Sequence, residues 1–326
     1  MELLAPAGDL ERLDAALRFG ADAVYLGGPI LQLRAKNAGF SMERLSEAAL
    51  RVHAAEKKLY IAVNAILRNG EVFELEDYTR ALQDLGADGV IVSDLGALRI
   101  IKRTAPNLPV HVSTQTNCMN HEAASMFHDL GASRIVLARE ISLDEIAEIR
   151  AKTSADLELE CFVHGAMCMA YSGRCLLSSW MHGQSANSGA CAQPCRYLYE
   201  VRTKGVEGYF PVLEEDGATT IFSSRDLNAM PFLDQLMEAG ISSFKIEGRM
   251  KSTYYVATVV NAYRHRLDGT ASTEACLAEL ECVSHRPYTS GFYFGEARFQ
   301  EHAGPDYSQA GDQQFPAKIP AAQRRG

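Results

Sequence analysis

A short phrase recurs along the chain, and each copy joins a glycine turn to a buried strand. It reads FGADAVYLG at 19–27, LGADGVIVS at 85–93, LGASRIVLA at 130–138 and AGISSFKIE at 239–247. Stretches with apolar residues at helical spacing lie between the copies, so strands and helices alternate. We expect eight strands, at 2–7, 23–28, 59–65, 89–94, 108–114, 133–139, 156–165 and 242–248. The expected helices are 8–20, 41–58 (with Ser41 as its N-cap), 74–86, 95–105, 121–131, 142–152, 227–240 and 252–267.

This number of βα units predicts an α/β fold of the (β/α)8 TIM-like barrel type, with an open doubly wound sheet as the alternative. The barrel is expected to span residues 1–268, interrupted after its seventh strand by an insertion at 165–226. Residues 208–226 have the pattern of a β-hairpin. Residues 269–326 are expected to begin a small C-terminal β domain, truncated here, or to form a linker.

Composition and charge limit the compartment and the partners of the chain. Its 326 residues are 47% hydrophobic, as in an ordinary globular protein. The N-terminus does not resemble a secretory signal, and no apolar run is long enough to span a bilayer, so we expect a cytoplasmic protein with no membrane partner. The net charge of −9 disfavours general phosphate binding but is compatible with small-molecule or metal-cluster chemistry.

Half of the cysteines gather in the insertion, at Cys168, Cys175, Cys191 and Cys195, with six, fifteen and three residues between them. Thiols stay reduced in the cytoplasm, which disfavours a disulfide staple. The six-residue gap is too long for the usual structural zinc pair, whereas iron–sulfur clusters tolerate more varied spacing. The pattern therefore favours a metal centre, an iron–sulfur cluster or alternatively zinc, over ordinary free cysteines.

Functional residues of a (β/α)8 barrel lie at the carboxyl ends of its strands. The expected strands are followed by a set of polar residues: Arg34, Asn64, Asp94, Gln115, Asn117, Arg139, Glu140, His164, Glu247 and Arg249. Glu247 and Arg249 also precede a helix, whose N-terminus beside an Arg suits a carboxylate or a phosphate. An ion pair that braces the barrel rim is an equal alternative, and His164 is as compatible with a structural role as with a catalytic one.

A peptidase would need a recognisable catalytic motif. The chain has no H-E-x-x-H, since His121-Glu122 lacks the second histidine, and it has no G-x-S-x-G. A cysteine nucleophile could pair with His164, but no sequence rule joins them. The motifs therefore disfavour proteolysis.

Several segments together resemble one known family. ECFVHGAMCMAYSGRCLLS closely resembles the signature of peptidase family U32, and further similar segments occur at matching places: LLAPAGDLERLDAALRFGADAVYLG, CAQPCR, SSRDL and KIEGRMKS. SHRPYTSGFYFG resembles the stretch that leads into the small C-terminal domain of that family. The resemblance covers nearly the whole chain.

The resemblance implies two different activities. The older description of the family is a collagenase-like peptidase, whereas similar proteins hydroxylate a tRNA wobble uridine, a ribosomal cytidine or a ubiquinone precursor, some with prephenate. Relatives of the ubiquinone branch hold a [4Fe–4S] cluster on four cysteines. Carried over by motif, Cys168, Cys175 and Cys191 match ligand positions. Some relatives have a further cysteine where this chain has Asn228, which leaves Cys195 as the fourth ligand or else a three-cysteine site.

We therefore expect a U32-family enzyme that hydroxylates the tRNA wobble uridine with a [4Fe–4S] cluster. The resemblance implies that His164, Glu247 and Arg249 line the catalytic cavity and orient an anionic co-substrate such as prephenate. The expected substrate-binding residues are Arg34, Asn64, Gln115, Asn117 and Arg139. The alternatives are a collagenase-like peptidase and a non-catalytic subunit that needs a second U32-family chain.

Overall fold

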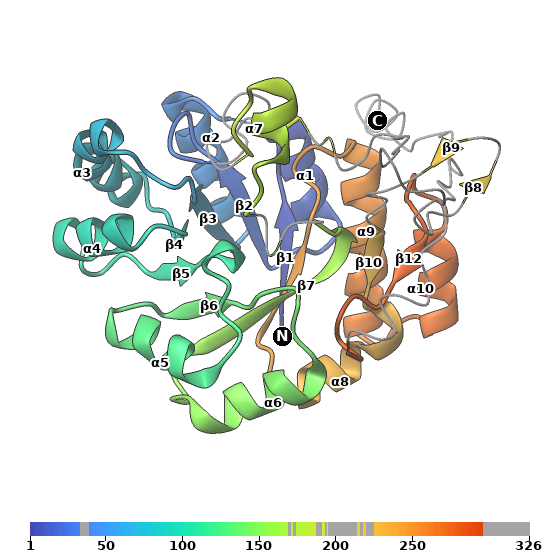
Figure 1. The fold of residues 1–326 in the computed structure, drawn as a ribbon. Helices are drawn as coiled ribbons and strands as arrows, with labels where there is room; N and C mark the ends of the chain where they lie inside the picture. The colour runs from blue at the N-terminus through green and yellow to red at the C-terminus, as the bar shows by residue number, and fades with distance from the viewer. Residues whose placement is uncertain are drawn as a thin grey trace, which may run out of the picture.

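Eight parallel strands close into a barrel in the computed structural model (Figure 1). The structure describes residues 1–32, 39–168, 171, 174–186, 191–192, 194, 214–215, 218–219 and 225–295. The barrel strands are β1 Glu2–Pro6, β2 Ala23–Gly27, β3 Lys58–Val63, β4 Gly89–Val92, β5 Val110–Val112, β6 Arg134–Val136, β7 Glu158–Ala166 and β11 Ser243–Ile246. They pair in that order, and β11 closes the ring by pairing with both β7 and β1. The predicted (β/α)8 barrel is confirmed.

Helices surround the barrel and alternate with its strands (Figure 1). They are α1 Leu10–Arg18, α2 Met42–Ala54, α3 Asn69–Asp84, α4 Leu95–Thr104, α5 His121–Asp129, α6 Leu143–Lys152, α8 Leu233–Glu238 and α9 Thr253–Leu267. Most begin where a short polar side chain accepts a hydrogen bond from a backbone N–H of the first turn, as Ser41 does for α2 and Ser142 for α6. None of the helices in the described ranges combines the length and the apolar character that crossing a membrane requires.

The insertion after β7 contains helix α7 Leu177–His182, the antiparallel pair β8 Glu214–Glu215 and β9 Ala218–Thr219, and strand β10 Asp226–Asn228. The expected start of a helix at residue 227 is wrong, because β10 pairs antiparallel with the end of β7. The side chain of Asn228 accepts a hydrogen bond from the backbone N–H of Met230, and a 3-10 turn over Met230–Phe232 carries Pro231 in its first turn. The helix therefore begins only at Leu233.

Two further elements lie within the segment 269–326. Helix α10 Thr273–Leu280, which the sequence pattern did not predict, packs against α9. Strand β12 Tyr288–Thr289 pairs parallel with β10 and extends the sheet at the root of the insertion. The Tyr293 hydroxyl donates a 2.6 Å hydrogen bond to the Phe162 carbonyl of β7. These described parts of the segment are packed on the barrel.

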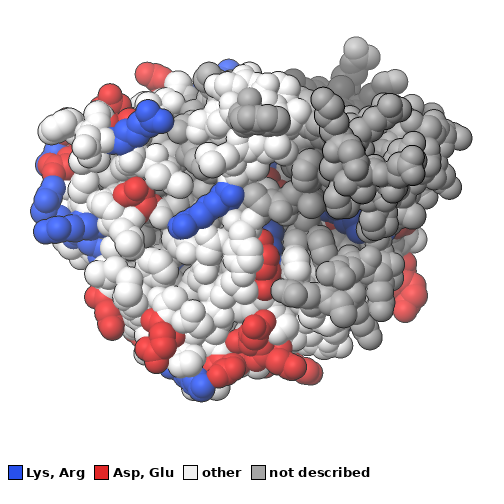
Figure 2. All heavy atoms as spheres, viewed as in Figure 1, with Lys and Arg blue, Asp and Glu red and all other residues white. Residues whose placement is uncertain are grey.

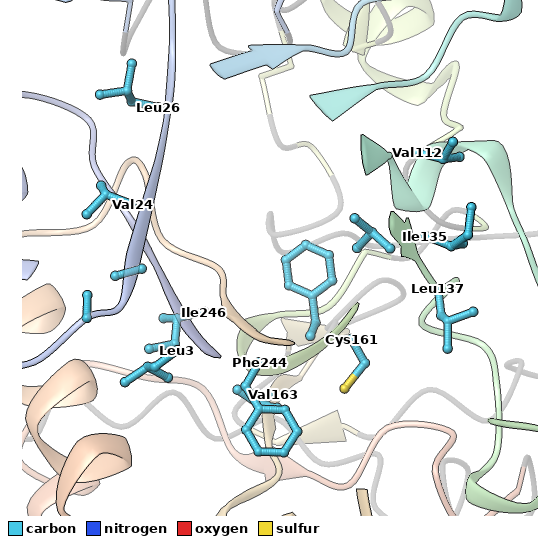
Figure 3. Packing of buried hydrophobic residues seen from close by; sticks show 14 of the residues in the cluster. Leu3, Val24, Leu26, Val112, Ile135, Leu137, Cys161, Val163, Phe244 and Ile246 are labelled. Atoms are coloured by element: carbon cyan, nitrogen blue, oxygen red, sulfur yellow. The ribbon is translucent and has the colours of Figure 1, made fainter. Parts of the chain in front are cut away.

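Alternate residues of each strand point outward and form the main apolar core with the helices. Figure 3 shows Leu3, Val24, Ile135, Cys161 and Phe244 in this cluster, all of them buried. The inward-pointing residues alternate with them along each strand.

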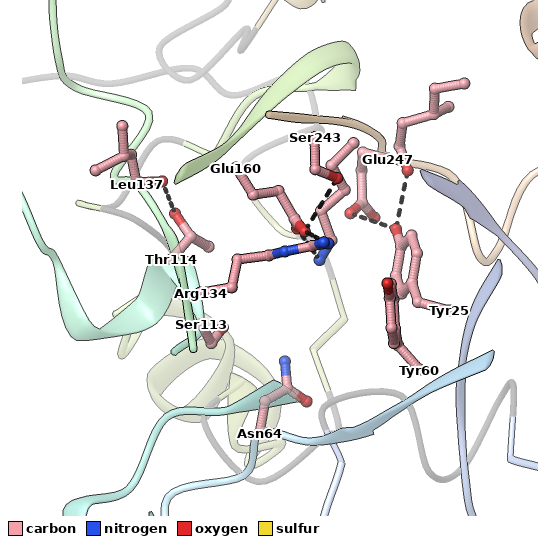
Figure 4. A network of polar contacts seen from close by, with 12 residues as sticks. Tyr25, Tyr60, Asn64, Ser113, Thr114, Arg134, Leu137, Glu160, Ser243 and Glu247 are labelled. Atoms are coloured by element: carbon pink, nitrogen blue, oxygen red, sulfur yellow. Dashed lines mark hydrogen bonds and ion pairs between the residues drawn. The ribbon is translucent and has the colours of Figure 1, made fainter. Parts of the chain in front are cut away.

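The inward faces of four strands carry a network of buried charges. The Arg134 guanidinium lies 2.5 Å from the Glu2 carboxylate and 3.0 Å from that of Glu160, and its side chain is only 2% exposed. Lys245 lies 2.7 Å from the other oxygen of Glu160, and the Ser243 hydroxyl donates to Glu2. Figure 4 shows Arg134 pointing at Glu160 with Ser243 beside it. Strands β1, β6, β7 and β11 are thus held together inside the barrel by charge.

The charged partners determine the protonation state of the two carboxylates. Burial alone would raise the pKa of Glu160, but Lys245 and Arg134 outweigh it and hold that pKa below the ordinary 4.5. Burial also opposes ionisation of Glu2, and the hydrogen bond and charge of Arg134 again bring the pKa below 4.5. Both carboxylates are therefore charged at neutral pH, and each depends on Arg134.

We predict that Arg134→Met lowers the free energy of unfolding by about 3–5 kcal/mol, because it leaves buried carboxylates without their partner. Urea denaturation at pH 7 measures the change. Arg103→Met is the matched control, because Arg103 is exposed and pairs with Glu76 at the surface, where an ion pair contributes at most about 1 kcal/mol.

The same variant has a predicted pH dependence. Carboxylates whose folded pKa is lowered contribute stability above their unfolded pKa and lose it as the pH falls through the folded pKa. The deficit of Arg134→Met should therefore shrink when the pH is lowered from 7 to below about 4.5. An equal deficit at both pH values, or no deficit at pH 7, contradicts the assigned network.

Candidate functional site

A first group of polar residues surrounds Arg249 at the carboxyl ends of β2 and β11. The Arg249 guanidinium lies 3.0 Å from the side-chain oxygen of Gln32, and both residues are buried. The guanidinium carbon is 5.8 Å from the centre of the Tyr25 ring, whose hydroxyl donates to the Ile246 carbonyl. A Cβ on Gly27 would lie 2.4 Å from Gln32 and 2.8 Å from Arg249. Only glycine at this position lets the two side chains approach the strand.

A second group surrounds Arg139 at the ends of β6, β7 and β11. Its guanidinium carbon stacks 3.9 Å from the centre of the Phe162 ring, and its terminal nitrogens lie 3.0 Å from the Ala166 carbonyl and 3.8 Å from the Glu247 carboxylate. The ammonium of Lys245 is 4.5 Å from the centre of the Tyr25 ring. The buried network of the barrel therefore continues up to the residues at its mouth.

A third group is centred on the buried side chain of Gln115, just after β5. Its amide oxygen accepts hydrogen bonds from Asn64 at 2.9 Å, Ser93 at 3.0 Å and Ser113 at 3.2 Å. Among the described residues, its buried amide nitrogen has no hydrogen-bond partner, and the same holds for Nε of Arg139. Both are donors, so the group that would satisfy them is an oxygen acceptor such as a carbonyl or a carboxylate.

His164 contacts the second group through its backbone, because its carbonyl accepts a hydrogen bond from the Glu247 N–H, whereas its ring is packed against helix α9 and strand β12. The ring is 1% exposed and is surrounded by Tyr255, Tyr263 and Tyr288, with ring centres 5.5–5.9 Å away. Its Nδ1 lies 3.4 Å from the Tyr263 hydroxyl. Burial lowers the pKa of His164 to about 3, against the charge of Asp226, which raises it. The imidazole is therefore neutral at physiological pH.

The described cysteines of the insertion lie on one loop and are not joined by disulfides. Cys168, Cys175 and Cys191 are half-buried, and the backbone N–H of Leu177 donates to the Cys175 sulfur at 3.4 Å. Half-buried thiols near backbone N–H donors are the type of ligand that binds an iron–sulfur cluster. Within the described ranges, however, no three Cys, His, Asp or Glu side chains come together as a metal site. Cys195 lies outside the described residues, as does Arg34.

The cysteine loop rests on the turn that follows β5. Asn117 has left-handed backbone geometry, with φ of 59°, and its side-chain amide donates to the Tyr171 carbonyl at 3.2 Å. Nε of Arg174 donates to the Gln115 carbonyl at 2.8 Å. Asn117, predicted as a substrate-binding residue, thus contacts the loop between Cys168 and Cys175 in this structure.

Sequence reasoning missed several residues of the mouth, namely Tyr25, Gln32, Glu160, Phe162 and Lys245. A signal for part of this set was present. Glu158 and Glu160 in β7, and Lys245 and Glu247 at the end of β11, each stand two positions apart in otherwise apolar segments. Charges with a period of two lie on one face of a strand, so both pairs indicate a charged barrel interior.

Comparisons with known proteins support the fold and identify the family of the chain. Residues 8–303 match the model of peptidase family U32. The tRNA hydroxylation protein P1 of Bacillus subtilis (strain 168) is 40% identical over 315 residues, covering 93% of this chain and 74% of that protein. A 23S rRNA 5-hydroxycytidine synthase of Escherichia coli (strain K12) is 37% identical over 278 residues, covering 85% of this chain and 41% of that protein.

A solved structure of the U32 peptidase Mk0906 has a similar fold, with a TM-score of 0.50 and 17% sequence identity over 77% of this chain and 94% of that chain. At this identity, the likeness supports the fold alone. The family model, by contrast, spans all barrel strands after β1, the insertion and the described elements that follow it. The chain belongs to peptidase family U32.

Proposed function

We propose that this chain hydroxylates a pyrimidine of RNA, and specifically the wobble uridine of tRNA. The observation that carries the proposal is the 40% identity to a tRNA hydroxylation protein over 93% of the chain. The mouth of the barrel supports it, because Gln115 and Arg139 each offer a buried donor that no described residue pairs with. A uracil ring and a carboxylated co-substrate both present oxygen acceptors that match such donors.

The charged residues of the mouth suit an anionic co-substrate such as prephenate. Arg249 and Arg139 both lie at strand ends, and a guanidinium can bind a carboxylate through two parallel hydrogen bonds. Glu247 lies 3.8 Å from Arg139 and limits the net positive charge there. We propose that Arg249 and Arg139 orient the co-substrate. Burial raises the pKa of Tyr25 well above its ordinary value, so its hydroxyl keeps the proton with which it holds the Ile246 carbonyl.

A [4Fe–4S] cluster is the proposed cofactor. Cys168, Cys175, Cys191 and Cys195 are the residues that would hold it, and the reducing cytoplasm, the proposed compartment, keeps such thiols available. The cluster would supply one-electron chemistry beside the mouth. A second U32-family subunit is a further proposed partner.

Proteolysis is the weaker candidate. A cysteine peptidase needs a histidine within hydrogen-bond reach of its nucleophile. His164, the histidine nearest to Cys168 in the sequence, is instead packed among tyrosines, and its Nδ1 faces Tyr263. These contacts give no support to a catalytic pair of Cys168 and His164.

Loss of the gene should remove 5-hydroxyuridine and its derivatives from tRNA, and the wild-type gene on a plasmid should restore them. Mass spectrometry of tRNA nucleosides measures both. An Arg249→Ala plasmid should restore less than about a tenth of the wild-type level, because the charge-assisted hydrogen bonds of that side chain are lost. Normal nucleosides in the deletion strain contradict the proposed function.

Protein purified without oxygen should contain iron and sulfide, and the double variant Cys168→Ala/Cys175→Ala should lose both. Each thiolate is a proposed ligand, so removing two of four leaves the cluster without half of its anchors. Metal analysis and the visible absorption spectrum measure the loss. Cys282→Ala is the control, because Cys282 is an exposed cysteine of the chain outside the insertion. Unchanged iron in the double variant contradicts the ligand assignment, and zinc in place of iron contradicts the cofactor.

The ring of His164 should not titrate between pH 5 and pH 8, because burial holds its pKa near 3. Proton NMR of the imidazole C–H signals tests this, and His164→Gln identifies the signal by its disappearance. A titration midpoint within that range would show that the histidine can exchange a proton at working pH, as a general base requires.

A further inference from the structure

The part of the cysteine loop between Cys168 and Cys175 presents one aromatic and one cationic side chain in fixed positions. Three contacts anchor the pair to the segment 115–119. The Tyr171 carbonyl accepts from Asn117, the Tyr171 hydroxyl bonds the Met119 sulfur, and Nε of Arg174 donates to the Gln115 carbonyl. The backbone N–H of Arg174 also donates to the Tyr171 carbonyl at 3.1 Å, so the two residues are bonded to each other.

Both side chains nevertheless reach solvent. The Tyr171 residue is 52% exposed although its hydroxyl is bonded, and Arg174 is exposed although its Nε is bonded. An exposed aromatic ring gains little for folding from such anchoring, since most of its apolar surface stays in water. A ring and a guanidinium held ready at the surface are instead the two groups with which proteins contact unpaired nucleotides.

Tyr171 and Arg174 lie close to the mouth of the barrel, because Gln115 contacts both Arg174 and the residues of the mouth. The backbone of Gln115 holds Arg174, and the side chain of the same residue binds Asn64 at the strand ends. A nucleotide whose base enters the mouth must leave its own stack, which costs the stacking with its neighbours. An aromatic ring beside the mouth can replace one of these neighbours for the adjacent base.

The distribution of charge on the described surface is compatible with an RNA base that binds near α7 by stacking. In the view of Figure 2, acidic side chains gather at the lower edge, where Figure 1 places α6 with Asp144 and Glu145 in its first turn. The described surface around α7, which belongs to the insertion, is mostly uncharged in the same view. On the described surface of this view, phosphates are therefore repelled more strongly at α6 than around α7.

We infer that Tyr171 and Arg174 bind an unpaired nucleotide next to the reacting one, with the Tyr171 ring stacked on its base and the Arg174 guanidinium on its phosphate. This inference rests on the proposed function and adds to it a contact that selects single-stranded RNA loops. Duplex RNA offers no free base face to the ring and is excluded.

Binding of an anticodon stem–loop RNA to the purified full chain tests the inference, with the stem alone, closed as a duplex, as the comparison ligand. Tyr171→Leu keeps apolar bulk without a π face and should weaken stem–loop binding roughly tenfold. Tyr171→Phe keeps the ring and should bind within about twofold of wild type. Arg174→Gln should lower the slope of log affinity against log salt by about 0.7, the value for one phosphate contact on a single strand.

Phe73→Ala is the matched control, because Phe73 is an 84% exposed aromatic residue on α3, outside the loop. Its stem–loop affinity should equal that of wild type. A second readout is photo-cross-linking to a stem–loop that carries 4-thiouridine beside the wobble position, with the cross-linked peptide identified by mass spectrometry. Cross-linking to the peptide that contains Tyr171 supports the inference.

The outcomes separate this inference from the proposed function. If the wild-type gene restores 5-hydroxyuridine while Tyr171→Leu binds the stem–loop as tightly as wild type, the nucleotide contact is overturned and the function stands. Cross-links that form only with peptides lacking Tyr171 likewise overturn the nucleotide contact and leave the proposed function standing. If Tyr171→Leu and Tyr171→Phe weaken binding equally, the hydroxyl contact and not the ring matters, which also overturns the stacking role. Absence of 5-hydroxyuridine in the complemented strain overturns the proposed function itself.

Discussion

The buried guanidinium of Arg134 is the interaction on which the barrel and its mouth depend. The Arg134 side chain, on β6, forms ion pairs with Glu2 of β1 and Glu160 of β7. Glu160 forms a second ion pair, with Lys245 of β11. Strand β11 is the one that closes the ring between β7 and β1. A buried charge needs its partner at a defined place, so this network restricts the register of the closing strands more tightly than apolar packing does. It also supports Lys245, whose ammonium faces the Tyr25 ring directly below the mouth.

Hydrogen bonds connect the mouth of the barrel to the cysteine loop. Arg139 binds the carbonyl of Ala166, where β7 ends and the loop begins. Gln115 binds Asn64 through its side chain and Arg174 of the loop through its carbonyl. Strand β10 pairs with the last residues of β7, and Arg286 next to β12 lies 2.8 Å from Asp226 of β10. The described part of the loop is thus fixed at its root by the sheet and, at Tyr171 and Arg174, by the segment that follows β5.

The sequence allowed the fold to be predicted because local signals agree with the global pattern. Ser41 and Ser142 mark helix starts, and outward-facing apolar residues such as Val24 and Ile135 mark the strands. The charged interior was not predicted, since a charged residue next to apolar ones looks like a strand end until its partners on other strands are known. For the same reason, no pattern shows that the His164 ring turns toward α9 or that Asn117 supports a loop more than fifty residues away. Such contacts between distant segments require the closed barrel.

The proposed action on RNA requires an acidic chain to obtain its affinity from a few local contacts. With a net charge of −9, long-range attraction to phosphates is weak, and each favourable contact has to be local. Base stacking and donor–acceptor pairing are local, and both need a base that is not already paired and stacked. A barrel mouth lined by donors, with an aromatic residue on the loop beside it, therefore favours bases in loops over bases in duplexes. The negative net charge then contributes to selectivity, because it weakens the nonspecific binding that would hold the chain on double-stranded RNA.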